Sequence, residues 1–367
     1  MILFRSRPCG KWHTKSMKAL LLTAYKHLEI ADLPKPEPGP AEVLIRVAAC
    51  GICGSDVHGY DGSSGRRIPP IVMGHEAAGV IAAVGSGVGA FKLGDRVTFD
   101  STVYCGCCDF CQRGEVNLCD QRQVVGVACG EYRRAGAFAE YIAVPERILY
   151  PLPGSISFAE AAMLEAVSVA LHAVRVSNLK GGETALVIGA GMIGLLTMQC
   201  ARAARCKSVF IADVDATRLN LAKILGATEA LHFSGGELTR EVMRLTGGAG
   251  VDVAFEAVGR DETVAASIDC VRKGGTVTLI GNVSQEVTLP LQRVVTRQLR
   301  LQGTAASAGE YPQAIDLVTS GTIQVKPLIT AVAPLEEGSQ WFERLYAREP
   351  NLMKIVLVPH AYAQAAP

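Results

Sequence analysis

Four cysteines lie close together in a polar stretch of the sequence, at Cys105, Cys108, Cys111 and Cys119. Their spacing, C-x2-C-x2-C-x7-C, can place four thiolates around Zn²⁺ with bonds of about 2.3 Å and no open coordination position. Because such a site is closed, we predict a structural zinc ion that stabilises a loop with little core of its own. A redox C-x-x-C pair is the alternative, but it would need only two of these cysteines. Cys107 does not fit the spacing and is interpreted as a bystander.

A second motif, the segment Gly189-Ala190-Gly191-Met192-Ile193-Gly194, matches G-x-G-x-x-G. The motif alone is a weak indicator, but here it follows a predicted strand at 185–188 and opens a predicted helix. In that context, backbone N–H groups at the start of the helix can face a pyrophosphate. Gly189 would allow the turn, Gly191 the close approach of the ligand, and Gly194 the packing of helix on strand. We therefore predict a dinucleotide site, with an unliganded glycine-rich turn as the alternative.

The nucleotide type is indicated by Asp213, which ends the next predicted strand nineteen residues after Gly194. A carboxylate there accepts hydrogen bonds from the adenosine ribose and repels a 2′-phosphate, so NAD is favoured over NADP. Asp215 adds a second negative charge. Arg218 leaves an alternative open, because its guanidinium could stack on adenine or pair with a phosphate.

A second metal site is suggested by donors that lie far apart in the chain: Cys53, His75, Glu76 and Glu165. Distant ligands suit an open, catalytic site. A lone Cys or His is more often a core residue, however, and spacing alone cannot show that these side chains meet.

The composition describes a globular chain long enough for two domains. Its 367 residues exceed the size of a single core, and its net charge of +1 disfavours nucleic acid as a partner. The longest apolar run, residues 184–201, is divided by three glycines into strand, turn and helix, so we predict no membrane span. Twelve cysteines, five of them at metal-ligand positions, favour reduced thiols and a cytoplasmic location.

The two ends of the chain are expected to lie outside the fold. Residues 1–16 lack a convincing secretory h-region and cleavage site, so we expect a non-folding leader there, with an organellar presequence as the alternative. Residues 360–367 are expected to form an unstructured tail.

The elements that position these residues follow two patterns. Residues 17–143 contain short β-like runs between glycines and prolines, and residues 31–40, with four prolines, are expected to be a surface connection and neither a helix nor a central strand. Residues 183–303 alternate strands, at 185–188, 209–212, 251–255 and 277–280, with helices beginning near residues 192, 216, 237 and 262, which predicts a parallel sheet covered on both faces. After residue 304 we expect one helix, 312–319, and a last strand, 354–358.

Together these motifs resemble the zinc-containing medium-chain dehydrogenases, in the branch of the sorbitol/L-iditol (polyol) and galactitol-phosphate dehydrogenases. The resemblance covers residues 17–359. It is carried by C-G-I-C-G-S-D-V-H at 50–58, P-x-V-M-G-H-E at 70–76, G-D-R-V at 94–97, the four-cysteine segment, and Ala170-Leu171-His172 after Glu165. It implies an α/β fold with a GroES-like β-rich catalytic domain at 17–167, a Rossmann NAD-binding domain at 168–303, and a return segment at 304–367 that completes the first domain.

The resemblance also implies roles for particular residues at a catalytic zinc. Cys53, His75 and one or both of Glu76 and Glu165 would surround the metal. The two glutamates would alternate between fourth ligand and hydrogen-bond partner of the zinc-bound water. Glutamate at 165, where other alcohol dehydrogenases have cysteine, is typical of the polyol and threonine dehydrogenases. Zinc would polarise a secondary alcohol so that a hydride passes to NAD and a ketone forms.

The proton and cofactor contacts follow from the same likeness. Ser55 would take the hydroxyl proton and pass it through the cofactor ribose toward His58, which releases it to solvent. Ile193 would contact the pyrophosphate. Three further residues would border the nicotinamide: Ile280, Gly281 and Thr304.

The sequence departs from the polyol pattern after residue 303, where Ala305 and Ala306 replace the Arg-Tyr pair that often holds substrate hydroxyls. The substrate is therefore a small-molecule alcohol of open identity. Alternatives are an L-threonine or butanediol dehydrogenase activity, and a non-catalytic nucleotide-binding relative. A homotetramer or homodimer is implied by the resemblance alone.

Overall fold

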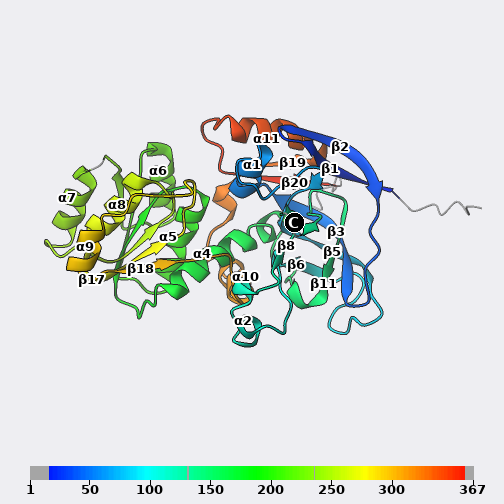
Figure 1. Ribbon diagram of the computed structural model, residues 1–367, viewed down its shortest axis with the longest axis horizontal. Coiled ribbons are helices and arrows are strands. Elements are labelled where there is room, and N and C mark those ends of the chain that lie inside the picture. The colour runs from blue at the N-terminus through cyan, green and yellow to red at the C-terminus, as the bar shows by residue number, and fades with distance from the viewer. Residues whose placement is uncertain (1–15, 130–131, 235, 360–367) are drawn as a thin grey trace, which may run out of the picture.

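The computed structural model describes residues 16–129, 132–234 and 236–359. Two lobes lie side by side, one built around a parallel sheet and the other rich in short strands (Figure 1). The predicted leader, apart from residue 16, and the predicted tail lie outside the described residues.

The first of these lobes contains a six-stranded parallel sheet in the order β15-β14-β13-β16-β17-β18. Numbered from its first strand, this order is 3-2-1-4-5-6, the arrangement of doubly wound dinucleotide-binding domains. Its strands are β13 (Thr184–Ile188), β14 (Ser208–Asp213), β15 (Glu229–His232), β16 (Val251–Glu256), β17 (Val271–Leu279) and β18 (Arg300–Gly303). Its helices are α5 (Met192–Ala203), α6 (Ala216–Ile224), α7 (Gly236–Leu245), α8 (Asp261–Cys270) and α9 (Leu291–Thr296).

Alternate residues of these strands face two different cores. Ala185 and Val187 of β13 pack in a core with α4 (Leu164–Val176) and α5, whereas Leu186 and Ile188 face a core on the other side of the sheet. Burial on both faces explains why the central strands read as continuous apolar runs. The prediction of a parallel sheet covered on both faces is confirmed.

The second lobe is organised around a mixed seven-stranded sheet in which β3 pairs with β5, β11 and β20. The strands of this lobe are β1 (Ser16–Ala24), β2 (His27–Pro34), β3 (Glu42–Gly51), β4 (Ile71–Val72), β5 (Glu76–Val84), β6 (Arg96–Phe99), β7 (Thr102–Val103), β8 (Gln123–Val124), β9 (Val127–Ala128), β10 (Arg133–Arg134), β11 (Tyr141–Pro145), β12 (Leu149–Pro151), β19 (Ile329–Pro334) and β20 (Lys354–Val358). Its helices include α1 (Gly54–Tyr60), α2 (Asp109–Gln112), α3 (Phe158–Ala161) and α11 (Gly338–Tyr346).

The return segment after residue 304 contains more structure than the sequence pattern indicates. Besides α10 (Tyr311–Thr319) and β20, it forms β19 and α11, so the expectation of one helix and one strand is wrong. In α11, Gly338 and Phe342 are buried, and Trp341 and Leu345 are partly buried against the same core, an amphipathic pattern that the sequence reasoning missed. β19, β20 and α11 contribute to the core of the β-rich lobe, whereas α10 packs with α4.

Two further details bear on the predicted boundaries. Residues 31–34 continue β2, an edge strand paired with β1, so the proline-rich connection begins only at residue 35. Helix α4 runs through the predicted boundary at 167/168, and the domain limits stay a prediction. Among the described residues, no helix is long and apolar enough to cross a membrane.

Candidate active site and metal centres

Three of the four predicted catalytic ligands lie together in the β-rich lobe. The ligand atoms of Cys53, His75 and Glu76 are all within 4.8 Å of one another. Cys53 is the residue before α1, and Glu76 begins β5. Gly74 makes the approach to His75 feasible, because its φ of +93° favours glycine and a Cβ there would lie 2.8 Å from the Phe138 ring.

This donor set fits zinc. One thiol, one imidazole and one carboxylate are ligands that zinc accepts, and three protein ligands leave a position open for a substrate oxygen. His75 and Glu76 are buried and Cys53 is half-buried. The cluster is therefore shielded from solvent on the side of His75 and Glu76 and more open on the side of Cys53.

Glu165 lies near this cluster but is not within the same 4.8 Å group. It is in the first turn of α4, and Ser101 donates a hydrogen bond to its Oε1 over 3.4 Å. Burial raises the pKa of Glu165 to about 7; Glu76 and Asp100 raise it further, while His75 and Lys354 oppose the rise. Its part in metal binding stays a prediction.

Asp56, which the sequence reasoning did not single out, connects two of the predicted ligands. Its Oδ2 accepts a hydrogen bond from the Cys53 backbone N–H at 3.3 Å, and its Oδ1 lies 3.3 Å from His75 Nδ1. Arg67 donates to the same Oδ1 from Nη2 at 3.0 Å. Burial would raise the pKa of Asp56, but His75 and Arg67 together hold it well below its usual value.

Lys354 is a second residue that the sequence reasoning missed. Its Nζ lies 2.6 Å from Glu76 Oε2 and donates to the Ile52 carbonyl at 3.1 Å. The two charged side chains are 3% and 1% exposed. Although burial alone would lower the pKa of Lys354, the Glu76 carboxylate raises it.

The predicted proton carriers both lie on α1. Ser55 Oγ is 3.5 Å from His75 Nε2, so the structure places this hydroxyl beside the cluster. His58 is exposed, one helical turn further along. Within the described residues, no hydrogen bond joins the His58 ring to Ser55; their relay stays a prediction.

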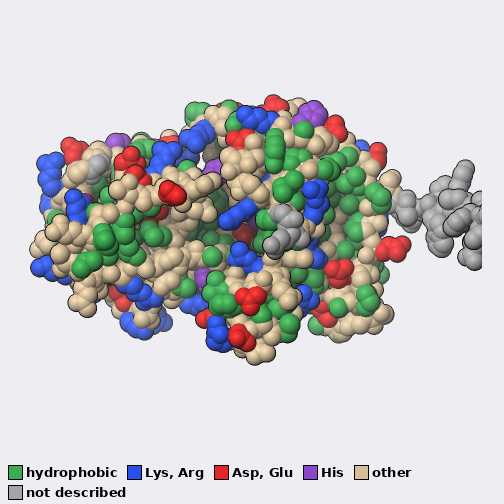
Figure 2. Space-filling view, in the orientation of Figure 1, with side chains coloured by type: hydrophobic (Ala, Val, Ile, Leu, Met, Phe, Trp, Pro, Cys, Tyr) green, Lys and Arg blue, Asp and Glu red, His purple; other side chains and the backbone are tan. Residues whose placement is uncertain are grey.

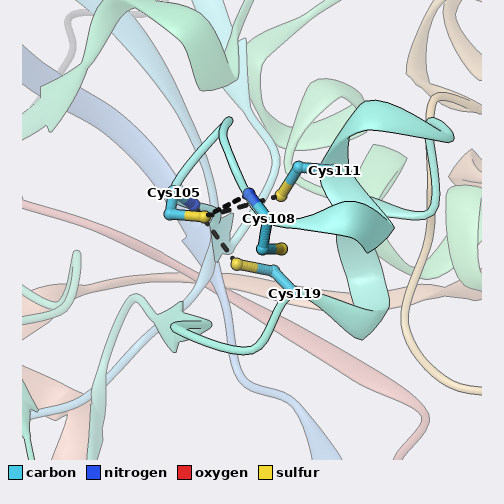
Figure 3. A group of neighbouring side chains, drawn as sticks. All are labelled: Cys105, Cys108, Cys111 and Cys119. Carbon is cyan, nitrogen blue, oxygen red and sulfur yellow. Dashed lines mark hydrogen bonds between the residues drawn. The ribbon is translucent and has the colours of Figure 1, made fainter.

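The four cysteines of the predicted structural site converge in a lobe formed by α2 and the segments around it. Their sulfur atoms lie within 4.8 Å of one another and turn toward a common centre (Figure 3). Backbone N–H groups of Cys107 and Cys108 each donate to Cys105 Sγ at 3.4 Å, which lowers the pKa of Cys105 to about 6 and favours a thiolate. The exposed Cys107 is outside the group, with its sulfur 3.6 Å from that of Cys105.

The glycine-rich turn connects β13 to α5 as the motif predicts. Gly189 has a φ of +101°, and a Cβ on Gly194 would lie 1.7 Å from the Gly189 carbonyl oxygen. A Cβ on Gly191 would meet nothing within 4 Å, so the space in front of the helix is open toward a ligand. Ile193 lies in the first turn of α5, where it can face the same ligand.

Asp213 and Arg218 have different surroundings at the end of β14. Asp213 Oδ2 accepts the Ala190 N–H of the glycine turn at 2.6 Å, and its Oδ1 accepts the Asp215 N–H at 2.9 Å. Asp215 caps α6 by accepting two backbone N–H groups. Arg218 lies 3.7 Å from Asp215 and is exposed enough to reach a ligand.

The predicted nicotinamide border is formed by neighbouring strand ends. The backbone N–H groups of Ile280 and Gly281 both donate to the Glu256 carbonyl, and that of Thr304 donates to the Leu279 carbonyl. The Thr304 hydroxyl is buried and has no hydrogen-bond partner among the described residues. In Figure 2 the surface is hollowed between the two lobes, and charged and histidine side chains gather there.

Comparisons with known proteins agree with this geometry. The family model "Alcohol dehydrogenase GroES-like domain" matches residues 39–154, and "Zinc-binding dehydrogenase" matches residues 193–320. A sorbitol dehydrogenase of Bacillus subtilis is 34% identical over 94% of this chain and 98% of its own length. An L-idonate 5-dehydrogenase of Vitis vinifera is 36% identical over 88% of each chain.

A solved structure is similar over the whole fold. It is a putative zinc-binding dehydrogenase from Sinorhizobium meliloti bound to NADP, 32% identical, with a TM-score of 0.84 over 94% of this chain and 100% of its own. The predicted resemblance and fold class are confirmed by these matches and by the two lobes. The chain belongs to the zinc-containing medium-chain dehydrogenases, among the polyol dehydrogenases.

Proposed function

We propose that this protein oxidises a secondary alcohol of the polyol, diol or sugar-alcohol type to a ketone, with NAD as hydride acceptor. The observation that carries the proposal is the cluster of Cys53, His75 and Glu76, within 4.8 Å of one another in a half-buried to buried setting. Asp56 accepts a hydrogen bond from the Cys53 N–H, and Lys354 donates one to Glu76, so both residues hold the cluster in place. A purely nucleotide-binding relative has no use for such an arrangement.

The metal chemistry is simple. Zinc held by these three residues would act as a Lewis acid on the alcohol oxygen, which makes hydride loss from the adjacent carbon feasible near neutral pH. Ser55, beside His75, takes the hydroxyl proton, and the exposed His58 releases it to solvent. Glu165, with its raised pKa, holds or accepts a proton next to the cluster or joins it as a ligand.

NAD is the proposed cofactor, bound across the glycine turn. Asp213 presents its carboxylate at the edge of that turn, where a 2′-phosphate would meet its negative charge. Arg218, which lies 3.7 Å from Asp215, would stack on the adenine. Ile193, Ile280, Gly281 and Thr304 are the further proposed contacts, and the unpartnered Thr304 hydroxyl is free to bond the cofactor amide.

The substrate pocket is expected to be less selective than that of a polyol dehydrogenase with an Arg-Tyr pair. Ala305 and Ala306 offer only methyl groups at those positions, and the Ala305 carbonyl already accepts a hydrogen bond from Asn117. A site without dedicated hydroxyl partners discriminates weakly between diols. L-Threonine and butanediol therefore stay in the range of proposed substrates.

A homo-oligomer is part of the proposal. Five apolar side chains between residues 283 and 295 are 38% to 66% exposed, and Figure 2 shows hydrophobic side chains gathered on this lobe. Strand β18 beside them is an edge of the parallel sheet. An exposed edge with apolar neighbours is a surface that a second copy of the chain would cover; light scattering measures the assembly.

The described cysteines are all free, which suits the proposed cytoplasmic location.

The test combines a metal count with a substrate panel. We expect two zinc ions per chain and NAD-dependent oxidation of at least one of sorbitol, galactitol phosphate, threonine and butanediol. Cys53→Ala should lose one zinc ion and the activity, while Cys107→Ala, at an exposed thiol outside both clusters, should keep both. One zinc ion per chain and no turnover would instead identify a non-catalytic relative.

A further inference from the structure

Arg67 is a buried cation next to the candidate active site that the proposed reaction does not use. Its side chain is 4% exposed, although arginine is rarely buried without a specific partner. Nε and Nη2 both donate to Asp56 Oδ1, at 3.3 and 3.0 Å. Nη2 also donates to Ser55 Oγ over 3.4 Å, and Nη1 donates to the Arg66 carbonyl at 3.2 Å.

The helix that carries Ser55 is shaped to admit this side chain. A Cβ on Gly59 would lie 2.1 Å from Arg67 Cγ and 2.8 Å from Arg67 Cβ. The φ of Gly59 is not in the left-handed region, so the backbone alone does not require glycine here. Glycine at this position therefore leaves room for the Arg67 side chain to cross α1.

The partner of Arg67 is a carboxylate that contacts two of the residues expected to bind metal, the half-buried Cys53 through its backbone and the buried His75 through its ring. Asp56 accepts from the Cys53 N–H and lies 3.3 Å from His75 Nδ1. A carboxylate behind a ligating histidine fixes the ring and increases its basicity. Arg67 competes for the same oxygen, so it limits how strongly Asp56 can polarise the ring.

The second contact of Arg67 orients the hydroxyl of Ser55. An oxygen that accepts a hydrogen bond from a guanidinium has one lone pair occupied, and its own hydrogen must point elsewhere. The hydrogen and the remaining lone pair of the Ser55 hydroxyl therefore point toward the cluster. His75 Nε2 lies 3.5 Å away on that side.

We propose that Arg67 is a positioning residue of the reaction, which holds Asp56 and the Ser55 hydroxyl in the geometry that metal binding and proton removal require. The inference rests on the proposed function. Arg67 does not contact the substrate in this proposal. Its role differs from that of a purely structural ion pair, because the electronic state of the metal site depends on it.

The experiment compares Arg67→Gln and Arg67→Lys with Arg66→Gln, a matched change at the exposed neighbouring arginine. Cobalt is exchanged into the catalytic site, and the visible spectrum of the substrate-free protein is recorded. We also measure kcat, KM and the solvent deuterium isotope effect. For Arg67→Gln we expect a shifted cobalt spectrum, a fall in kcat of about tenfold or more, a smaller change in KM and a larger isotope effect. Arg67→Lys should recover part of kcat, and Arg66→Gln should match the wild type.

Loss of folding in Arg67→Gln would not leave the question open. Gly59→Ala keeps both charges but displaces the Arg67 side chain, and Asp56→Asn/Arg67→Gln removes both charges together. Gly59→Ala should show the same spectral shift as Arg67→Gln, whereas the double variant, which also lacks the carboxylate that polarises His75, should shift the spectrum in the opposite direction. A folded Arg67→Gln or Gly59→Ala protein with a lower melting temperature, but with unchanged spectrum, kcat and isotope effect, would overturn the inference. The wild type distinguishes the two proposals: failure to bind cobalt at Cys53 or to oxidise any alcohol counts against the proposed function itself.

Discussion

At the scale of single residues, the candidate site is defined by buried charges that neutralise one another. A carboxylate oxygen of Glu76 lies within the cluster, and its Oε2 accepts a hydrogen bond from Lys354 Nζ at 2.6 Å. A buried ion pair adds little stability compared with apolar residues, but loss of one partner leaves an uncompensated charge. The pair therefore makes the position of Glu76 depend on a residue far along the chain.

Replacement of Lys354 by methionine is expected to destabilise the protein by about 3 to 5 kcal/mol, because Glu76 would stay buried without its partner. Urea unfolding measures the change. The double variant Glu76→Gln/Lys354→Met should recover much of the loss, and Lys326→Met, at an exposed lysine, should change stability by less than about 0.5 kcal/mol. An equal loss in the single and double variants would show that the ion pair is not the cause.

Asp213 allows a test of cofactor choice. Asp213→Asn removes the negative charge that faces a 2′-phosphate, so the ratio of kcat/KM for NAD over NADP is expected to fall. Asp215→Asn is the matched control, since asparagine also caps a helix and Asp215 accepts backbone N–H groups of α6. Unchanged cofactor selectivity in Asp213→Asn would show that this residue does not bind the ribose.

Local spacing alone indicated some of the predicted site residues, whereas the distant catalytic ligands were indicated by the family resemblance. The four cysteines and the glycine turn are each contained in a short segment, so their geometry follows from the motif. Lys354 lies 278 positions from Glu76, and Arg67 meets Asp56 only because α1 lacks a side chain at Gly59. No periodic pattern in the sequence predicts such pairings.

At the scale of elements, the cysteine lobe is tied to the segment that follows β18. Asn117, between Cys111 and Cys119, donates to the Ala305 carbonyl at 2.8 Å, and its Nδ2 lies 3.3 Å from His172 Nε2. His172 Nδ1 is in turn 2.9 Å from Glu310. Ala305 follows Thr304, a proposed contact of the nicotinamide, so the lobe supports one wall of the proposed cofactor site.

Removal of zinc from the cysteine lobe is therefore expected to loosen residues 105–119 first and then to weaken cofactor binding several-fold. Limited proteolysis reports the first effect and NADH fluorescence titration the second. Asn117→Leu should weaken NADH binding with the lobe zinc still bound. Tight NADH binding by a protein whose lobe has lost zinc would contradict the coupling.

Four strands of the parallel sheet, β13, β14, β16 and β17, were predictable as short apolar runs, and a helix start closely follows each of the first three. The predicted helix starts at 192, 216, 237 and 262 lie within one residue of those observed. Strand β15, in which only Leu231 is buried, lacks such an apolar run, whereas the amphipathic α11 carries a helical pattern that the sequence reasoning overlooked. Their positions are fixed by partners distant in sequence.

At the scale of the whole molecule, a buried acidic side chain joins two parts of the chain that are far apart in the sequence. Asp100, at the end of β6, accepts a hydrogen bond at 3.1 Å from Ser307, which lies 207 positions later in the return segment. Burial raises the pKa of Asp100 to about 6, although the bonds from Thr102 and Ser307 oppose the rise. The folded protein therefore binds a proton here more tightly than the unfolded chain does.

The stability from this group is complete below the ordinary pKa of an aspartate and is lost as pH rises through about 6. Between pH 5 and pH 7, the wild type is expected to lose about 1 kcal/mol relative to Asp100→Asn. Urea unfolding of both proteins at several pH values measures the difference. Parallel stability curves would show that Asp100 has no raised pKa.

The position of β20 has a consequence for synthesis on the ribosome. This strand pairs with β3 and brings Lys354 to Glu76, yet it is translated after the entire parallel-sheet lobe. A nascent chain can thus complete its nucleotide-binding half while Glu76 still lacks its buried cation. We therefore expect metal capture at the proposed site of Cys53 and His75 to follow the pairing of β20 with β3.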